Sequence, residues 1–117
     1  MKMKDNYLTY KGYVGTVNYS YEDDILYGNI DGINDSISYH AESVKELKTA
    51  FEEAVDDYLE ICATVGKNPE KSYKGSFNVR VGPKLHKKAA KAATIRGVTL
   101  NQLVQHAIEK EVEFIDN

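Results

Sequence analysis

The chain has 117 residues, of which 42 % are hydrophobic and 28 % charged, and its formal net charge is −3. This composition is that of a folded protein with one ordinary domain or two small ones, and not of a disordered chain. No apolar run approaches the roughly 20 residues that span a bilayer, and no apolar stretch of a signal peptide follows the first residues. The single cysteine, Cys62, excludes an internal disulfide and a thiolate metal site. We therefore expect a cytoplasmic protein without metal or cofactor.

The charge is distributed unevenly along the chain. Residues 1–70 hold 6 lysines and 14 acidic residues, a balance of −8, whereas residues 71–108 hold eight basic residues and no acidic one. An acidic front part and a basic back part predict two regions with different partners. The basic region is the candidate for binding nucleic acid.

The first forty residues predict an antiparallel sheet. Runs rich in Tyr, Val, Ile and Thr alternate with connectors that carry turn residues, a pattern typical of hairpins. The first two runs either merge across Tyr13–Gly15 or turn there. Seven tyrosines fall within the first 39 residues, and we expect some in the core and two or three exposed for a partner. The predicted strands are 7–13, 14–19, 25–30 and 37–40.

An amphipathic helix is predicted over 43–65. Its apolar residues recur on one side at helical spacing, Ser43 is the expected N-cap, and Gly66 closes the helix in the left-handed conformation. Because the sheet needs a cover for one face, residues 1–66 are expected to form one α+β domain. Residues 67–74 are polar and lie where the charge balance reverses, so they are the predicted linker.

Residues 75–117 predict a strand, a helix, a turn and a second helix. Apolar and polar residues alternate from Ser76 to Val81, as in a strand. Pro83 suits the first turn of a helix that ends at Gly97. Thr99 and Gln102 have the spacing of a capping box at the start of the next helix.

This last region is expected to form a homodimer. A unit of about 40 residues rarely buries enough surface to fold alone without metal or disulfide, and a single strand leaves its backbone groups unpaired. Antiparallel pairing with the same strand of a second chain solves both problems. The expected dimer core consists of the apolar side chains of this strand and of the two helices, namely Phe77, Val79, Val81, Leu85, Leu103 and Val104.

The other face of the paired strands would carry Ser76, Asn78 and Arg80. A two-stranded ribbon fits the major groove of DNA, where Arg binds guanine and Asn binds adenine through paired hydrogen bonds. The start of the second helix offers backbone amides to a phosphate, and lysines add attraction that does not depend on sequence. The expected phosphate contacts are Lys84, Thr99, Leu100 and Asn101, with Lys87, Lys88 and Lys91 adding to the positive field.

The stretch from Gly75 to Pro83, followed by a helix and Gly97-Val-Thr-Leu-Asn-Gln-Leu-Val104, resembles the ribbon-helix-helix repressors of the Arc and MetJ type. The resemblance implies base contacts for the alternate strand residues and a phosphate-binding helix start at Thr99 and Leu100.

The front half resembles the HicB family. The similar stretches are Tyr13-Val-Gly-Thr-Val-Asn-Tyr19, Leu26-Tyr-Gly-Asn-Ile-Asp-Gly32, and Ala54-Val-Asp-Asp-Tyr-Leu59 with Cys62; with the tail, the resemblance covers residues 7–112. It implies a truncated ribonuclease-H-like sheet and helix that binds and blocks a HicA-type ribonuclease toxin. It also implies a C-terminal domain that represses the operon of this type II toxin–antitoxin pair.

Two other hypotheses remain. The chain is alternatively a stand-alone transcriptional regulator without a cognate toxin. A nuclease would need acidic side chains grouped around a metal, and only Asp31 and Asp35 near a strand end suggest one, although acids in turns are common for other reasons. We therefore expect no enzymatic activity. Association of the front domains could also raise the dimer to a tetramer.

Overall fold

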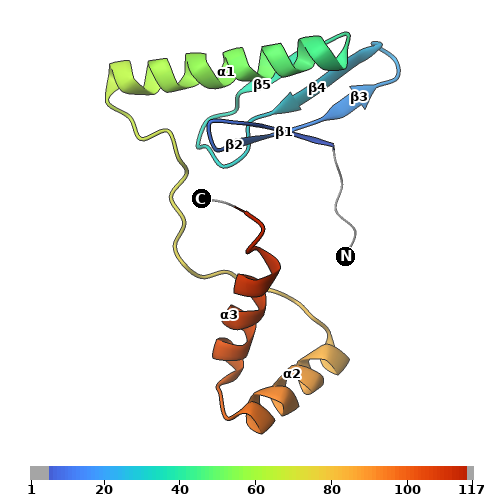
Figure 1. Cartoon of the computed structure of the whole chain (residues 1–117), viewed down its shortest axis with the longest axis vertical. Helices are drawn as coiled ribbons and strands as arrows, with labels where there is room; N and C mark the ends of the chain where they lie inside the picture. Colours follow the sequence, from blue (N-terminus) through green and yellow to red (C-terminus); the bar gives the residue numbers. More distant parts are fainter. Residues whose placement is uncertain (1–5, 116–117) are drawn as a thin grey trace. The chain divides into compact units, whose positions relative to one another are not determined.

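The computed structural model describes residues 6–115, and the chain divides into two compact units, Met1–Tyr73 and Lys74–Asn117. The described part is α+β, with two small antiparallel sheets and three helices (Figure 1). This confirms the predicted class. Within residues 6–115, no helix combines the length and the apolar character needed to cross a membrane.

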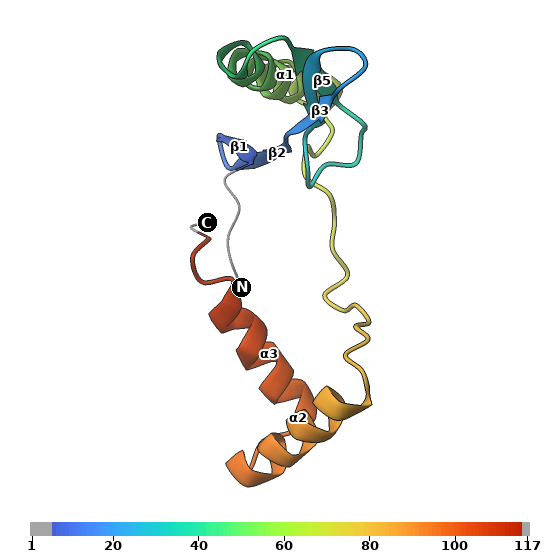
Figure 2. The ribbon, with the colours of Figure 1, turned by 90° about the vertical axis from the view of Figure 1, so that its right-hand side faces the viewer.

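The strands of the first unit form an antiparallel meander. β1 pairs with β2, and β4 lies between β3 and β5. A bridge between Gly15 and Ile30 joins the two sheets, so β2 and β3 follow one another along β4. The helix α1 lies on one side of these strands (Figure 2). The bounds are β1 (Tyr7–Tyr10), β2 (Tyr13–Thr16), β3 (Asn18–Ser20), β4 (Ile25–Asn29) and β5 (Ser38–Ala41).

The first hairpin turns at Lys11 and Gly12, so the expectation of a turn or a merger at Tyr13–Gly15 was wrong. The two turn residues have positive φ angles of 51° and 82°, as a two-residue type I′ turn requires. Lys-Gly is a less distinctive turn pair than Asn-Gly or Asp-Gly. The turn is fastened to α1, because the Lys11 ammonium and the Tyr10 hydroxyl both donate to the Asp56 carboxylate, at 2.7 and 3.0 Å.

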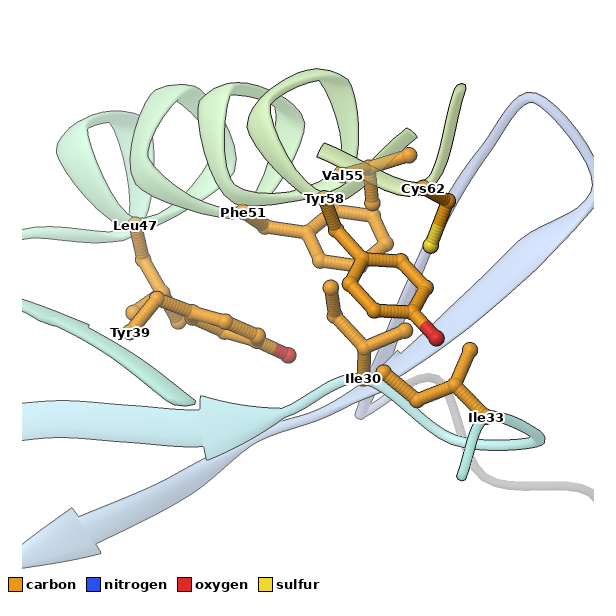
Figure 3. Close-up of a cluster of buried hydrophobic side chains, with 8 residues drawn as sticks. All are labelled: Ile30, Ile33, Tyr39, Leu47, Phe51, Val55, Tyr58 and Cys62. Atoms are coloured by element: carbon orange, nitrogen blue, oxygen red, sulfur yellow. The ribbon is translucent and has the colours of Figure 1, made fainter. Parts of the chain in front are cut away.

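The helix α1 (Val44–Val65) begins and ends as predicted. The Glu46 backbone N–H donates to the Ser43 hydroxyl at 3.1 Å, and Gly66 has a φ of 69°. One side of the helix packs on the sheet through Leu47, Phe51, Val55, Tyr58 and Cys62, all buried (Figure 3).

The sheet contributes Ile30, Ile33 and Tyr39 to the same core. The Tyr39 ring lies 5.3 Å from the Phe51 ring between centroids, and its hydroxyl donates to the Thr16 carbonyl at 2.7 Å. Burial raises the pKa of Tyr39 to about 12. This buried hydroxyl therefore stays protonated and holds β2 beside β4 and β5.

Gly28 in β4 has no room for a side chain. A Cβ atom there would lie 1.8 Å from the Thr16 carbonyl oxygen and 2.9 Å from the Tyr39 hydroxyl. We expect Gly28→Ala to lower the free energy of unfolding by about 1–3 kcal/mol, the usual cost of overpacking. Urea denaturation followed by circular dichroism measures it. The control Ser38→Ala, at an exposed position of β5, should change it by less than about 0.5 kcal/mol, and equal losses would contradict this account.

Residues 67–71, the first part of the predicted linker, are attached to the first unit. The Tyr58 hydroxyl donates to the Pro69 carbonyl at 3.0 Å, and the Lys71 N–H donates to the Gly32 carbonyl at 3.0 Å. A bridge pairs Glu70 with Ile33, and the Lys67 ammonium forms an ion pair with Asp35. The stretch that is not held in this way is therefore shorter than residues 67–74.

Two carboxylates of the first unit are ion-paired, and this gives its stability a pH dependence. The hydrogen bond from Lys67 lowers the pKa of Asp35 below its usual 3.8, and that from Lys11 does the same for Asp56. The two carboxyl groups therefore bind protons at a higher pH in the unfolded chain than in the folded chain. The ion pairs stabilise the fold above about pH 4, and this stabilisation is lost as the pH falls further.

We expect the urea midpoint of wild type to fall between pH 5 and pH 3 by more than that of the double variant Asp35→Asn, Asp56→Asn. Both pairs face solvent, so the difference between the two proteins is small. An equal fall of the urea midpoint in the two proteins would show that neither ion pair contributes to the pH dependence of stability.

The second unit contains the helices α2 (Pro83–Arg96) and α3 (Leu100–Glu111). Gly97, with a φ of 71°, ends α2, and the Val98 N–H donates to the Ala93 carbonyl at 3.0 Å. The predicted capping box opens α3. The Gln102 N–H donates to the Thr99 hydroxyl at 3.0 Å, and the Thr99 N–H donates to the Gln102 side-chain oxygen at 2.9 Å.

Candidate nucleic-acid interface

The segment 75–82 carries the three predicted base contacts, Ser76, Asn78 and Arg80. It lies between two glycines with positive φ, Gly75 at 87° and Gly82 at 83°. The structure of the single chain has no strand in this segment, which differs from the sequence prediction. The physical reason is that a strand is defined by its hydrogen-bonded neighbour, and among residues 6–115 this segment has none.

The apolar side chains of the same segment are not buried either. Phe77, Val79 and Val81 are 73 %, 62 % and 48 % exposed. All side chains from Ser76 to Val81 are exposed, so a single chain does not separate the apolar set from the polar set. The alternation of apolar and polar side chains separates a buried face from an exposed face only when another part of the protein covers the apolar side chains.

The helices of the second unit also leave their apolar sides uncovered. Ala93 is the only buried residue within the described part of this unit, Lys74–Ile115. A groove between α2 and α3 is lined by Leu85, Leu103 and neighbouring alanines, together with charged side chains that include Lys88 and Glu109. Of the predicted dimer-core residues on the helices, Leu85 and Val104 are 54 % and 43 % exposed, and Leu103 is half-buried. The expected burial of α3 is therefore not reached within one chain.

The four lysines of α2 share one side of the helix. Lys84, Lys87, Lys88 and Lys91 follow the spacing i, i+3, i+4, i+7, which places them on one stripe, and all four are exposed. The expectation that they supply a positive field stays a prediction, and their helical spacing places that field on one side of α2.

The start of α3 has two free backbone donors. The capping box uses the N–H groups of Thr99 and Gln102, and within the described chain no acceptor faces the N–H groups of Leu100 and Asn101. The prediction that the Thr99 amide is free was wrong, since the Gln102 side chain occupies it. An anion would meet the amides of the next two residues, at the positive end of the helix dipole.

The region therefore combines positive charge, two free amides and an uncovered apolar surface. A family model matches this part of the chain: the HicB family, over residues 58–108. The matched range is less than half of the chain, and over it the chain is similar to the HicB family. It runs from the end of α1 through residues 67–82 and α2 into α3.

Comparisons with curated proteins and with solved structures gave no match. Residues 1–57 lie outside the matched range, and they contain all five described strands.

Of the two acids that suggested a nuclease site, Asp35 is ion-paired with Lys67. Asp31 forms a backbone hydrogen bond, in which its N–H donates to the Val14 carbonyl at 2.8 Å. In the part of the chain that the structure describes, no three His, Cys, Asp or Glu side chains are grouped so that they could hold a metal ion.

Proposed function

We propose that the chain is a non-catalytic antitoxin of the HicB type. Its first unit binds and blocks a HicA-type ribonuclease toxin, and its second unit forms a homodimer that represses its own operon. The observation that carries the proposal is the match of the HicB family to residues 58–108.

The exposed apolar surface of the second unit supports the dimer. A free chain that leaves Phe77, Val79 and Val81 largely in solvent loses the hydrophobic stabilisation that burial of these side chains would give, about 1.5–3 kcal/mol each. In the dimer that we propose, the 75–82 segments of two chains pair as an antiparallel ribbon. The apolar side chains then pack on the four helices.

The positive charge of the second unit supports DNA binding. No acidic residue occurs between Lys71 and Ile108, so phosphates meet no repulsion from this stretch. In the proposed complex, Asn78 and Arg80 of both chains contact bases, and Ser76 contributes a hydroxyl at the edge of the ribbon. The lysines of α2 and the amides of Leu100 and Asn101 position the protein on the backbone.

The negative charge of the first unit supports the toxin as its partner. A ribonuclease must bind polyanionic RNA and is therefore expected to be basic, and an acidic antitoxin surface accelerates association with such a protein. The same acids keep the first unit away from the operator.

The test is reconstitution with the small basic protein encoded by the adjacent reading frame. We expect that protein to arrest growth and degrade RNA when expressed alone, and to be silenced and co-purified when the full chain is expressed with it. The full chain should also shift the DNA upstream of its own gene and not a scrambled fragment of equal length. Failure of both assays would overturn the proposal.

A second candidate is a stand-alone regulator that represses genes without a toxin. It is favoured by one observation, that the family match leaves residues 1–57 outside. Under this alternative, the upstream DNA is shifted as above, but no neighbouring product is neutralised or co-purified.

A further inference from the structure

The side of the sheet opposite α1 is exposed and almost free of charge. We call it the outer face. The strand register aligns Asn18, Tyr27 and His40 in one row across β3, β4 and β5, and all three are exposed. A second row consists of Thr16, Asn29 and Ser38. The Thr16 hydroxyl donates to the Asn29 side-chain oxygen at 2.7 Å, which ties β2 to β4 on this side.

β1 and β2 extend the outer face with exposed apolar surface. Tyr7 and Val14 are 55 % and 44 % exposed, and Tyr27 of the central strand is 43 % exposed. Within the described part of the first unit, no helix lies on this side of the strands (Figure 2). Exposed tyrosines without charged neighbours are typical of the centre of a protein interface, where charged residues are depleted.

The rim of the outer face is acidic. Glu22, Asp23 and Asp24 lie in the connector at one end of β4, and Asp31 and Asp35 lie in the connector at its other end; all are exposed. No lysine or arginine occurs from Gly12 to Val44. Two lysines also lie near this rim, but both are ion-paired, Lys67 with Asp35 and Lys11 with Asp56. The outer face is thus a neutral, tyrosine-bearing surface whose connectors carry a net negative charge.

This charge pattern decides what kind of molecule fits the surface. A second copy of the unit would bring the same acids against these acids, and a nucleic acid would bring phosphates, so both are repelled. A basic protein is attracted by the rim and meets tyrosine and amide side chains at the centre. The exposed side of α1 is less suitable, because Lys45 and Lys48 interrupt its acids.

We propose that the outer face, and not the exposed side of α1, is the docking surface for a basic protein partner. The proposal rests on the proposed antitoxin function, for which the partner is the HicA-type toxin. It places Tyr27 of the central strand, with Asn18 beside it, at the centre of the contact, and His40 of the edge strand β5 toward its border.

The test compares two variants of the full chain that add the same single charge. Tyr27→Arg places it on the outer face, and Ala63→Arg places it at an exposed position of α1. The probe is the basic protein encoded by the adjacent reading frame, titrated calorimetrically into each protein. We expect Tyr27→Arg to weaken binding at least about tenfold, as for a central interface tyrosine, and Ala63→Arg to remain within about twofold of wild type.

Circular dichroism shows whether Tyr27→Arg folds. If it does not, Asn18→Arg replaces it, because Asn18 lies opposite Tyr27 in the register. Equal binding by wild type and the folded outer-face variant would overturn the docking surface and leave the antitoxin function standing. Loss of binding with Ala63→Arg alone would move the surface to α1. No binding by wild type would overturn the proposed function, and the docking surface with it.

Discussion

Replacing Phe77 by alanine is expected to convert the proposed dimer into monomers at micromolar concentration. In the dimer, this ring passes from an exposed position, 73 % accessible in the single chain, into a core between two ribbons and four helices. Removing a fully buried phenylalanine costs about 3–5 kcal/mol. This corresponds to a dissociation constant raised at least about a hundredfold. Sedimentation velocity of the full chain over a concentration series measures it.

Phe77 is suited to this test because its side chain is largely exposed in the single chain and is not part of the buried core of the first unit. The structure of the first unit does not involve it, so the unfolding transition of Met1–Tyr73 should be unchanged. The control is Asn78→Ala, one position along, whose side chain would face away from the dimer core. It should leave the dimer intact. A wild-type chain that sediments as a monomer would contradict the ribbon model altogether.

The helices and the fold class could be predicted from the sequence because their determinants are local. Ser43 and Gly66 bound α1, and Thr99 with Gln102 opens α3, at the expected residues. Each of these caps depends on residues within one or two helical turns. The buried side of α1 likewise follows from the spacing of its apolar residues.

Features that depend on distant contacts were predicted less well. The hairpin turn at Lys11 is stabilised by Asp56, 45 residues along the chain. The attachment of residues 67–71 depends on a hydroxyl of Tyr58 and on the connector at Gly32. Neither contact leaves a local pattern in the sequence, because polar stretches that are docked and polar stretches that are free have similar compositions.

The 75–82 segment shows a different kind of limit. Its alternating pattern predicts a strand, yet one chain contains no strand there. The alternating pattern in the sequence is suited to pairing between two chains, whereas the structure contains a single chain. In the single chain, Val79 and Val81 are exposed. These are the side chains that the predicted ribbon would bury.

Replacing Arg80 by alanine is expected to weaken sequence-specific DNA binding while leaving the dimer in place. The guanidinium belongs to an exposed side chain of the 75–82 segment, and it can bind guanine through two hydrogen bonds in the major groove. Without this contact, the free energy of binding to the correct base becomes less favourable by about 1–3 kcal/mol in each half-site. Fluorescence anisotropy with labelled upstream DNA, and with a scrambled fragment of equal length, measures the difference.

The control for Arg80 is Lys87→Ala, on the lysine stripe of α2. A lysine that contacts only phosphate acts on every sequence alike, so this variant should weaken binding to both fragments equally. It should also lower the salt dependence by about one counterion per chain, or about two per dimer. Arg80→Ala should instead lower the affinity for upstream DNA by more than the affinity for the scrambled fragment. Equal losses on both fragments would show that Arg80 contacts the backbone, and base recognition would then have to come from Asn78 and Ser76.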